Sequence, residues 1–144
     1  MGSFSCFALD ARNSKQSGST KKHEGNAVVL LYNQKTGETY LDGEFEGIGY
    51  SGTGDGRNNP DMEDVPNVGP IPRGKYKIGQ PYYSSRCGPI CFPLEPVGHD
   101  AHGRTDLRIH GDNKTGDASQ GCIILGRTIR SRIRDDRETE LEVV

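Results

Sequence analysis

The sequence predicts one mainly β domain with a single short helix. Its 144 residues leave room for one domain and one hydrophobic core. Twenty glycines and the absence of tryptophan are typical of a turn-rich β protein. Hydrophobic residues make up 31% of the chain and fall in short runs, which favours a small core built mostly from strands.

Strands are expected where short apolar or alternating runs are bounded by turn residues. The runs at residues 27–32 and 38–41 flank a turn and predict a hairpin, which residues 45–50 extend into a meander. Residues 51–70 are rich in Gly, Asn and Pro and are predicted to form a long loop. Further strands are expected at residues 75–78, 90–94, 107–110, 122–125 and 139–144.

One segment has the spacing of an amphipathic helix. Ile129 and Ile133 stand one helical turn apart, and arginines occupy most positions around them. The pattern predicts a short helix over residues 128–134 that packs its isoleucines on the core and leaves its arginines in solvent.

The chain is expected to consist of a flexible N-terminal tail, residues 1–25, and one domain, residues 26–144. Its net charge is −2 with both signs interspersed, so nothing marks a nucleic-acid surface. No apolar stretch approaches the roughly 20 residues that span a bilayer. Because no classical signal peptide is recognised, we expect synthesis in the cytoplasm and export by another route.

The segments around His110 and Cys122 contain the residues best suited to catalysis. His110 ends one predicted strand and Cys122 begins another, so adjacent strands would bring them within hydrogen-bond reach. A thiol attacks as thiolate, and a neighbouring imidazole can take its proton. A carbonyl at Gly111 could fix the imidazole tautomer, and the N–H groups of Gly121 and Cys122 could face a developing oxyanion. The alternative is that this Cys–His pair is structural, with Cys122 part of the core.

The same region resembles the L,D-transpeptidase (YkuD-type) superfamily. The chain is most similar to the small L,D-transpeptidase-like family that contains type VI secretion effectors and prophage-borne relatives. The similar stretches, in order, are Gly49-Tyr50-Ser51-Gly52, Asn58-Asn59-Pro60, Gly69-Pro70-Ile71-Pro72-Arg73-Gly74 with Tyr76, Gly103-Arg104, Ile109-His110-Gly111-Asp112 and Ala118-Ser119-Gln120-Gly121-Cys122.

The resemblance implies a β-sandwich enzyme that acts on peptidoglycan stem peptides of the cell wall. Cys122 would be the nucleophile and His110 the base in an L,D-carboxypeptidase or L,D-transpeptidase, a hydrolase or transferase reaction that includes D-amino-acid exchange. Arg104 would bind a stem-peptide carboxylate through two parallel hydrogen bonds. The remaining residues assigned by the resemblance are Gly111, Ser119 and Gly121 in the catalytic segments, and Tyr50, Ser51 and Asp112 with Arg104 in substrate binding.

The resemblance also implies a toxin-like effector that acts in the periplasm or cell wall of a target cell. Its partners would then be stem peptides, an immunity protein and a secretion apparatus, and the chain itself is expected to be a monomer without a cofactor or metal.

Two departures from larger superfamily members limit the range of reactions that the resemblance implies. Gln120 stands where they carry His, and the connection from His110 to Cys122 is shorter. We therefore expect a trimming or exchange enzyme rather than a dedicated cross-linker.

Two alternatives stay open from the residues alone. The domain could be a non-catalytic peptidoglycan-binding module on the same scaffold. It could also be an interaction domain stapled by zinc through Cys87, Cys91, His99 and His102, although the two pairs are closer together than in most zinc fingers. A Cys87–Cys91 disulfide is favoured over zinc binding if the protein reaches an oxidising compartment. Calcium binding by Asp10, Asp55, Asp61 and Glu63 is less expected than solvation.

Overall fold

The structure, a computed structural model, describes residues 30–144. The predicted tail at residues 1–25 lies outside the described residues. Within them are ten strands, three short 3-10 helices and the α-helix α2, Arg127–Asp136. The strands are β1 Leu30–Tyr32, β2 Glu38–Leu41, β3 Glu44–Ile48, β4 Tyr50–Ser51, β5 Gly74–Ile78, β6 Tyr82–Ser84, β7 Gly88–Val97, β8 Arg108–His110, β9 Ile123–Ile124 and β10 Glu140–Val143.

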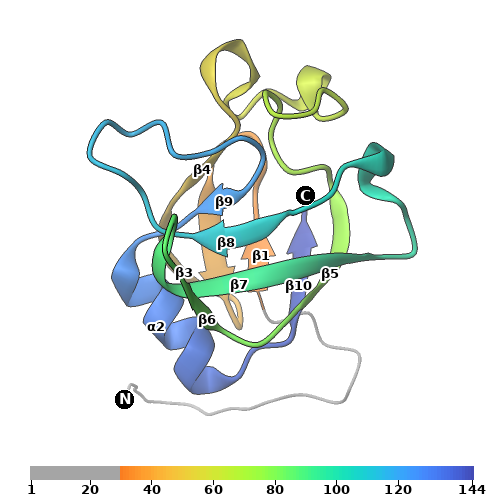
Figure 1. Ribbon diagram of the computed structural model, residues 1–144. Helices are drawn as coiled ribbons and strands as arrows, with labels where there is room; N and C mark the ends of the chain where they lie inside the picture. Colours follow the sequence, from red (N-terminus) through yellow and green to blue (C-terminus); the bar gives the residue numbers. More distant parts are fainter. Residues whose placement is uncertain (1–29) are drawn as a thin grey trace.

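The strands form one curled sheet in the order β3-β2-β1-β10-β5-β7-β8-β9-β4, with β6 paired to β7. Strand β7 connects the two halves, because it pairs with β5 through Leu94–Val97 and with β8 through Phe92 and Pro93 (Figure 1). Two pairings are parallel, β1 with β10 and β8 with β9, and the others are antiparallel. The second parallel pair carries the candidate site.

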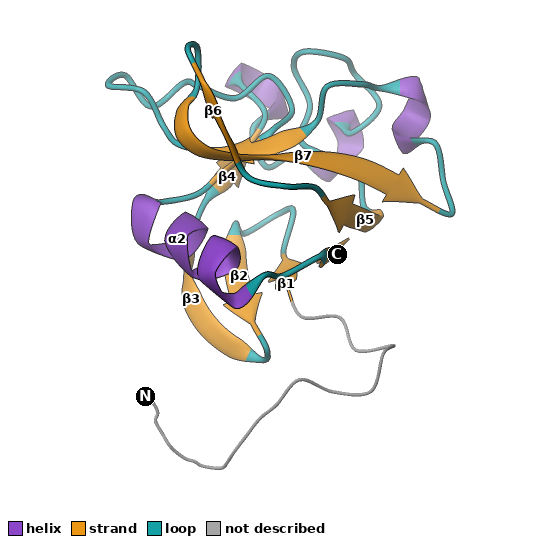
Figure 2. Cartoon of the chain, turned by 60° about the horizontal axis from the view of Figure 1, so that its bottom comes forward, coloured by secondary structure: helices purple, strands orange, loops and turns teal. Residues whose placement is uncertain are grey.

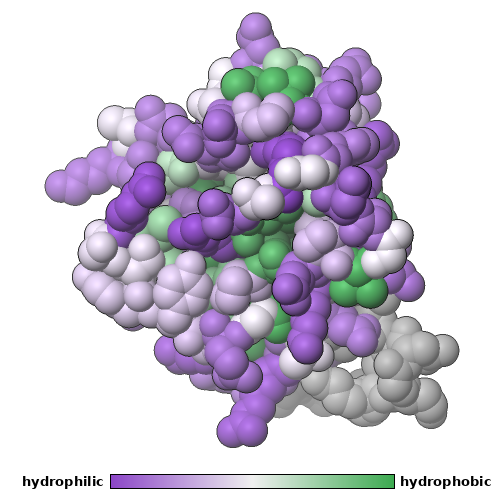
Figure 3. All heavy atoms as spheres, turned by 45° about the vertical axis from the view of Figure 1, so that its right-hand side comes forward, coloured by the Kyte–Doolittle hydropathy of each residue, from purple (hydrophilic) through white to green (hydrophobic). Residues whose placement is uncertain are grey.

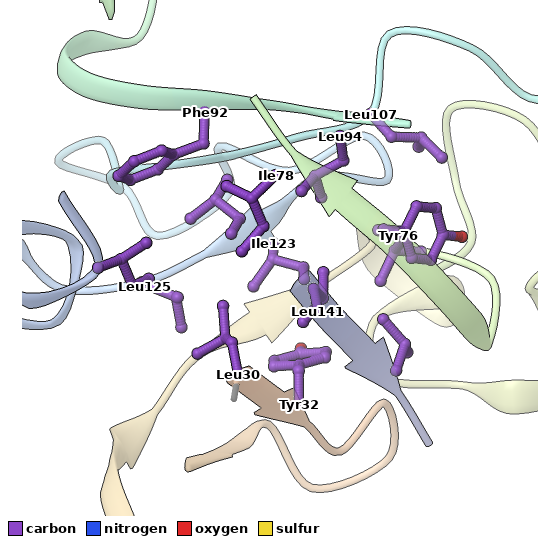
Figure 4. Close-up of a cluster of buried hydrophobic side chains, with 14 of the residues drawn as sticks. Leu30, Tyr32, Tyr76, Ile78, Phe92, Leu94, Leu107, Ile123, Leu125 and Leu141 are labelled. Atoms are coloured by element: carbon purple, nitrogen blue, oxygen red, sulfur yellow. The ribbon is translucent and has the colours of Figure 1, made fainter. Parts of the chain in front are cut away.

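Both halves of the sheet pack on the same hydrophobic core. Figure 4 shows Leu30 and Leu141 of one half beside Ile123 of the other. These three side chains are at most 1% exposed. Burying a side chain of this size stabilises the fold by about 1.5–3 kcal/mol. The prediction of a single, mainly β domain is therefore confirmed. Figure 3 shows a face that is largely hydrophilic, in keeping with the polar composition.

Helix α2 confirms the predicted amphipathic segment and extends it at both ends, but Arg130, which was expected in solvent, is buried. Ile129 and Ile133 are buried, and the helix ends at Arg137, which adopts the left-handed conformation with φ 56°. Helix α2 lies beside β3 (Figure 2), since a Cβ added at Gly47 of β3 would lie 2.9 Å from Cδ1 of Ile129. An ion pair of 3.4 Å between Arg132 and Glu46 connects α2 to β3.

The main differences from the predicted strands are local. The run at residues 45–50 is divided into β3 and β4 at Gly49, whose N–H donates to the Gly37 carbonyl at 2.8 Å. Strand β6, Tyr82–Ser84, was missed because its two tyrosines are exposed and no alternation marks the segment. Over residues 30–144 no helix is long and apolar enough to cross a bilayer.

Candidate active site

The register of β8 and β9 places His110 and Cys122 on one face of the sheet. Ile109 faces Ile123 in this parallel pair, and Cys122 immediately precedes β9, where the same register would continue toward Arg108. Side chains alternate between the faces of a strand. Because Ile109 and Ile123 are fully buried in the core, Arg108, His110 and Cys122 share the opposite face.

On that face His110 and Cys122 line the same cavity, which has a volume of about 550 Å³. Its walls come from segments that are distant in sequence: the loop at residues 66–67, the β6–β7 turn, residues 103–108 and the loop at residues 111–118. A cavity of this size is in the range of small-molecule and peptide sites. The fold therefore supplies a pocket around the predicted cysteine–histidine pair.

His110 is oriented by the residue that follows it. Its Nδ1 lies 2.9 Å from the Gly111 carbonyl oxygen. Because a carbonyl can only accept, Nδ1 donates and the lone pair is left on Nε2. Burial lowers the pKa of His110 below its usual value, and the Gly111 carbonyl opposes that shift. The imidazole is therefore neutral near pH 7 and able to accept a proton at Nε2.

Glycine at position 111 is required by packing. A Cβ there would lie 2.6 Å from Nη2 of Arg130. The buried Arg130 guanidinium donates to the carbonyls of Leu125 at 2.9 Å and Pro89 at 2.7 Å. Arg130 thus connects α2 to the strands below His110, and Gly111 lets it approach.

The Cys122 side chain is half-buried and lies over the backbone before Arg108. Its Sγ donates to the Asp106 carbonyl at 3.7 Å, and within the described residues no hydrogen bond joins it to His110. Burial raises the pKa of the Cys122 thiol to about 11, against the opposing effects of the Arg108 N–H and guanidinium. The expected direct contact with His110 is thus absent in this conformation, in which both groups are neutral.

Ser119 holds the turn that leads to Cys122. Its Oγ donates to the Cys122 carbonyl at 2.6 Å and accepts from the N–H groups of Gly52 at 2.8 Å and Gly121 at 3.1 Å. The fully buried Ser51 supports the same turn, because its Oγ donates to the Gly121 carbonyl at 3.3 Å. Since the Gly121 N–H already has an acceptor, it does not point freely into the pocket as expected.

Tyr50 forms hydrogen bonds with the loop at residues 111–118, which borders the cavity. Its hydroxyl donates to Asp112 Oδ1 at 2.6 Å and accepts from the Ala118 N–H at 3.0 Å. The Arg57 guanidinium lies 3.7 Å from the centre of its ring. Tyr50 is buried and is not among the residues that line the cavity, whereas Asp112 is. The tyrosine thus braces the 111–118 loop instead of facing the pocket directly.

Arg104 differs most from the expectation. Its guanidinium is buried and donates to the carbonyls of Glu63 and Pro70, each at 2.7 Å, and of Gly69 at 3.1 Å. A longer contact of 3.5 Å reaches the Gln120 carbonyl. The expected pair of hydrogen bonds to a substrate carboxylate would require donors that the backbone already uses. Arg104 borders the cavity but holds the long loop against the Cys122 turn.

The expected metal ligands do not come together. In the part of the chain that the structure describes, no group of three or more His, Cys, Asp or Glu side chains could hold a metal ion. His99 instead contacts the Lys75 carbonyl at 2.9 Å, and His102 contacts Glu63 at 3.1 Å. Cys87 and Cys91 are not joined by a disulfide in the structure. A bond between them in an oxidising compartment stays a prediction. In the structure these four residues therefore do not form the expected zinc site.

Arg108 and Cys87 line the cavity, but the sequence did not assign either of them to the active site, and Cys87 was considered only as a zinc ligand or disulfide partner. The two-residue period of a strand could have identified Arg108, because it lies two positions before His110 and so on the same face. Nothing in the sequence indicates that Cys87 lies here, since the β6–β7 turn was not predicted.

Fold and site together define a small β domain with a cysteine and a histidine in one cavity. The Tlde1 domain family matches residues 46–144, well over half of the sequence, and the chain belongs to this family. No curated protein matches the chain.

Fourteen chains of solved structures match this chain, and two of these structures show the extent of the likeness. One is the LD transpeptidase LdtMt1 in complex with imipenem, with a TM-score of 0.47, 15% identity, and coverage of 82% of this chain and 59% of that one. The other is the helical cell shape determining protein Pgp2 from Campylobacter jejuni, with a TM-score of 0.49, 17% identity, and coverage of 81% and 46%. The chain spans about half the length of these structures.

Proposed function

We propose that the chain is a peptidoglycan enzyme that uses Cys122 as nucleophile and His110 as general base. The observation that carries the proposal is their placement on one sheet face and in one cavity. The motif resemblance and membership of the Tlde1 domain family, a type VI effector family, support it. The substrate class is the stem peptide, at the amide bond that follows diaminopimelate.

The reaction would begin from a neutral thiol and a neutral imidazole. Rotation of the Cys122 side chain away from the Asp106 carbonyl lets the thiol proton pass to Nε2 of His110, and the sulfur attacks the amide carbonyl. The tetrahedral intermediate collapses as the imidazolium donates its proton to the leaving amine, and a thioester on Cys122 remains. Water then hydrolyses the thioester and releases a shortened peptide. If the amine of a free amino acid attacks the thioester instead of water, an exchanged peptide is released.

The Cys122 N–H is the proposed oxyanion donor. Of the two expected donors it is the one left, because the Gly121 N–H donates to Ser119. A single oxyanion donor is worth on the order of 100-fold or more in turnover. Delivery to a target cell wall, a cognate immunity protein and a monomeric state belong to the same proposal.

Muropeptide turnover tests the proposal. Purified tetrapeptide muropeptides, incubated with the protein with and without a free D-amino acid, should yield tripeptide or exchanged tetrapeptide by mass spectrometry. Cys122→Ala and His110→Ala should each lower turnover by at least about 1000-fold while the melting curve stays unchanged. Cys87→Ser, which alters another thiol of the same cavity, is the matched control and should keep most of the turnover.

Two outcomes contradict the proposal. Turnover that persists in Cys122→Ala would remove the nucleophile assignment. Muropeptide binding without any turnover by the wild type would instead favour the non-catalytic binding module. A thioester adduct, seen as the mass of the tripeptide acyl group on intact wild-type protein but absent from Cys122→Ala, would directly support the covalent step.

A further inference from the structure

A cavity that handles stem peptides faces a ligand rich in carboxylates, and the structure offers two arginines near the nucleophile. Arg104 and Arg108 both line the cavity. They differ in what their guanidinium groups already bind. This difference determines which of them is free to recognise a substrate anion.

Arg104 has its donors occupied. Three short hydrogen bonds go to backbone carbonyls of the 63–70 segment, and its side chain is buried. Turning this guanidinium toward a ligand would leave buried carbonyl groups without partners, at a cost of about 1–3 kcal/mol for each. Arg104 is therefore poorly suited to bind a ligand.

Arg108 is in the opposite situation. Its side chain is 30% exposed, and its ion-pair partner within residues 30–144 is Asp106, at 3.8 Å. Asp106 is itself 85% exposed, so this pair is screened by water and contributes little. The guanidinium can exchange this partner for a better one at small cost.

The position of Arg108 relative to the sulfur points to one part of the substrate. Arg108 lines the same cavity as Cys122, which immediately precedes the strand paired with β8, and the charge of Arg108 opposes the upward shift of the thiol pKa. A carboxylate bound there would lie close to the carbonyl under attack. In a peptide cleaved at its last amide bond, the α-carboxylate of the leaving residue is the carboxylate nearest to that carbonyl.

The other charged cavity residues are less suited to this role. Asp112 and Asp117 carry negative charge and accept hydrogen bonds from Tyr50 and Asn113. Arg86 is exposed on the β6–β7 turn. Among the described arginines of the cavity, only Arg108 is half-buried, has a single weak ion pair, and lies on the sheet face that carries Cys122.

We infer that Arg108 binds the free C-terminal α-carboxylate of the residue that leaves, and so restricts the enzyme to terminal residues. The inference rests on the proposed function and deepens it. The same site would hold the carboxylate of an incoming free amino acid in exchange. A guanidinium suits this task because its paired N–H groups match a carboxylate. Stem peptides without a free carboxylate at that position would be poor substrates.

The test compares a synthetic tetrapeptide stem that ends in a carboxylate with the same peptide ending in a carboxamide. Wild type should prefer the acid by about tenfold or more in kcat/KM. Arg108→Gln should lower kcat/KM for the acid by about tenfold more than for the amide, so that the preference for the acid is lost. Arg108→Lys should restore part of the preference, because it keeps the charge but loses the planar fork.

Binding separates this inference from the proposed function. In a Cys122→Ala background, calorimetry should give a dissociation constant about tenfold lower for the acid than for the amide, and Arg108→Gln should abolish that difference. If wild type cleaves neither peptide, the proposed function fails while the binding comparison still tests Arg108. Equal binding of acid and amide to Cys122→Ala would overturn the inference. An equal loss of preference in Arg86→Gln would overturn it too, since it would point to the general charge of the cavity.

Discussion

The guanidinium of Arg104 lies directly against Gly121, the residue that precedes Cys122. A Cβ at position 121 would overlap Nη2 of Arg104, and Gly121 has a φ of +123° that side chains rarely adopt. Gly121 therefore serves two requirements at once, the backbone shape of the turn and the close approach of a buried cation.

Gly121→Ala should lower the free energy of unfolding by about 3 kcal/mol, because strain and overlap add. It should also lower turnover, since the turn that carries Cys122 must move. Urea unfolding and muropeptide turnover measure the two effects. Gly116→Ala is the matched control: Gly116 has a φ of +73° but open space around it, so about 1 kcal/mol is expected. Equal losses in the two variants would show that the Arg104 contact contributes nothing.

Two neutral groups in one cavity predict a specific pH profile. His110 must be neutral to take the thiol proton, so wild-type kcat/KM should fall only as pH drops through its lowered pKa and should be level above it. His110→Ala must rely on thiolate, and the raised pKa of Cys122, about 11, makes thiolate scarce at neutral pH. Its residual rate should rise about tenfold per pH unit toward pH 11. A level profile in His110→Ala would contradict this mechanism.

Tyr50→Phe tests the brace on the 111–118 loop. The substitution leaves the buried ring in place but removes the hydroxyl that bonds Asp112 and the Ala118 N–H. The expected loss is about 1–2 kcal/mol, with faster amide exchange at Ala118. Urea unfolding and hydrogen exchange measure both. Tyr83→Phe, at a side chain that is 72% exposed, should change neither; unaltered exchange at Ala118 in Tyr50→Phe would argue against a brace.

Glu63 links the long loop to the body of the domain and should make stability depend on acid pH. Although burial alone raises its pKa, hydrogen bonds from Arg73, Gln34 and His102 lower it to about 2. A carboxylate with a depressed folded-state pKa adds stability above its unfolded pKa, about 4.3, and loses it as pH falls through 2.

Glu63→Gln should therefore lower the free energy of unfolding by about 2 kcal/mol at pH 7 and flatten its dependence between pH 2 and 5. Urea unfolding across this range provides the measurement. Glu140→Gln, at an exposed glutamate of β10, is the control and should follow the wild-type curve. An unchanged slope in Glu63→Gln would place the acid sensitivity elsewhere.

Local patterns were sufficient for most of the fold. Alternation and turn residues predicted the first hairpin, β5, β8, β9 and β10, and the pair Ile129 and Ile133 predicted α2. These features depend on neighbours within a few positions, which the sequence displays directly. Strand β6 was missed because its exposed tyrosines carry no such pattern, and its pairing with β7 is a tertiary contact.

The site divides in the same way. The sequence by itself determined that His110 ends one predicted strand and Cys122 begins another, with a glycine beside each. Only the tertiary structure decided that the pair shares a face and a cavity, that the thiol rests on the Asp106 carbonyl, and that Arg104 holds backbone while Arg108 is available. The physical reason is that hydrogen-bond partners of a buried charge come from distant segments, and no local pattern records which carbonyl groups will surround it.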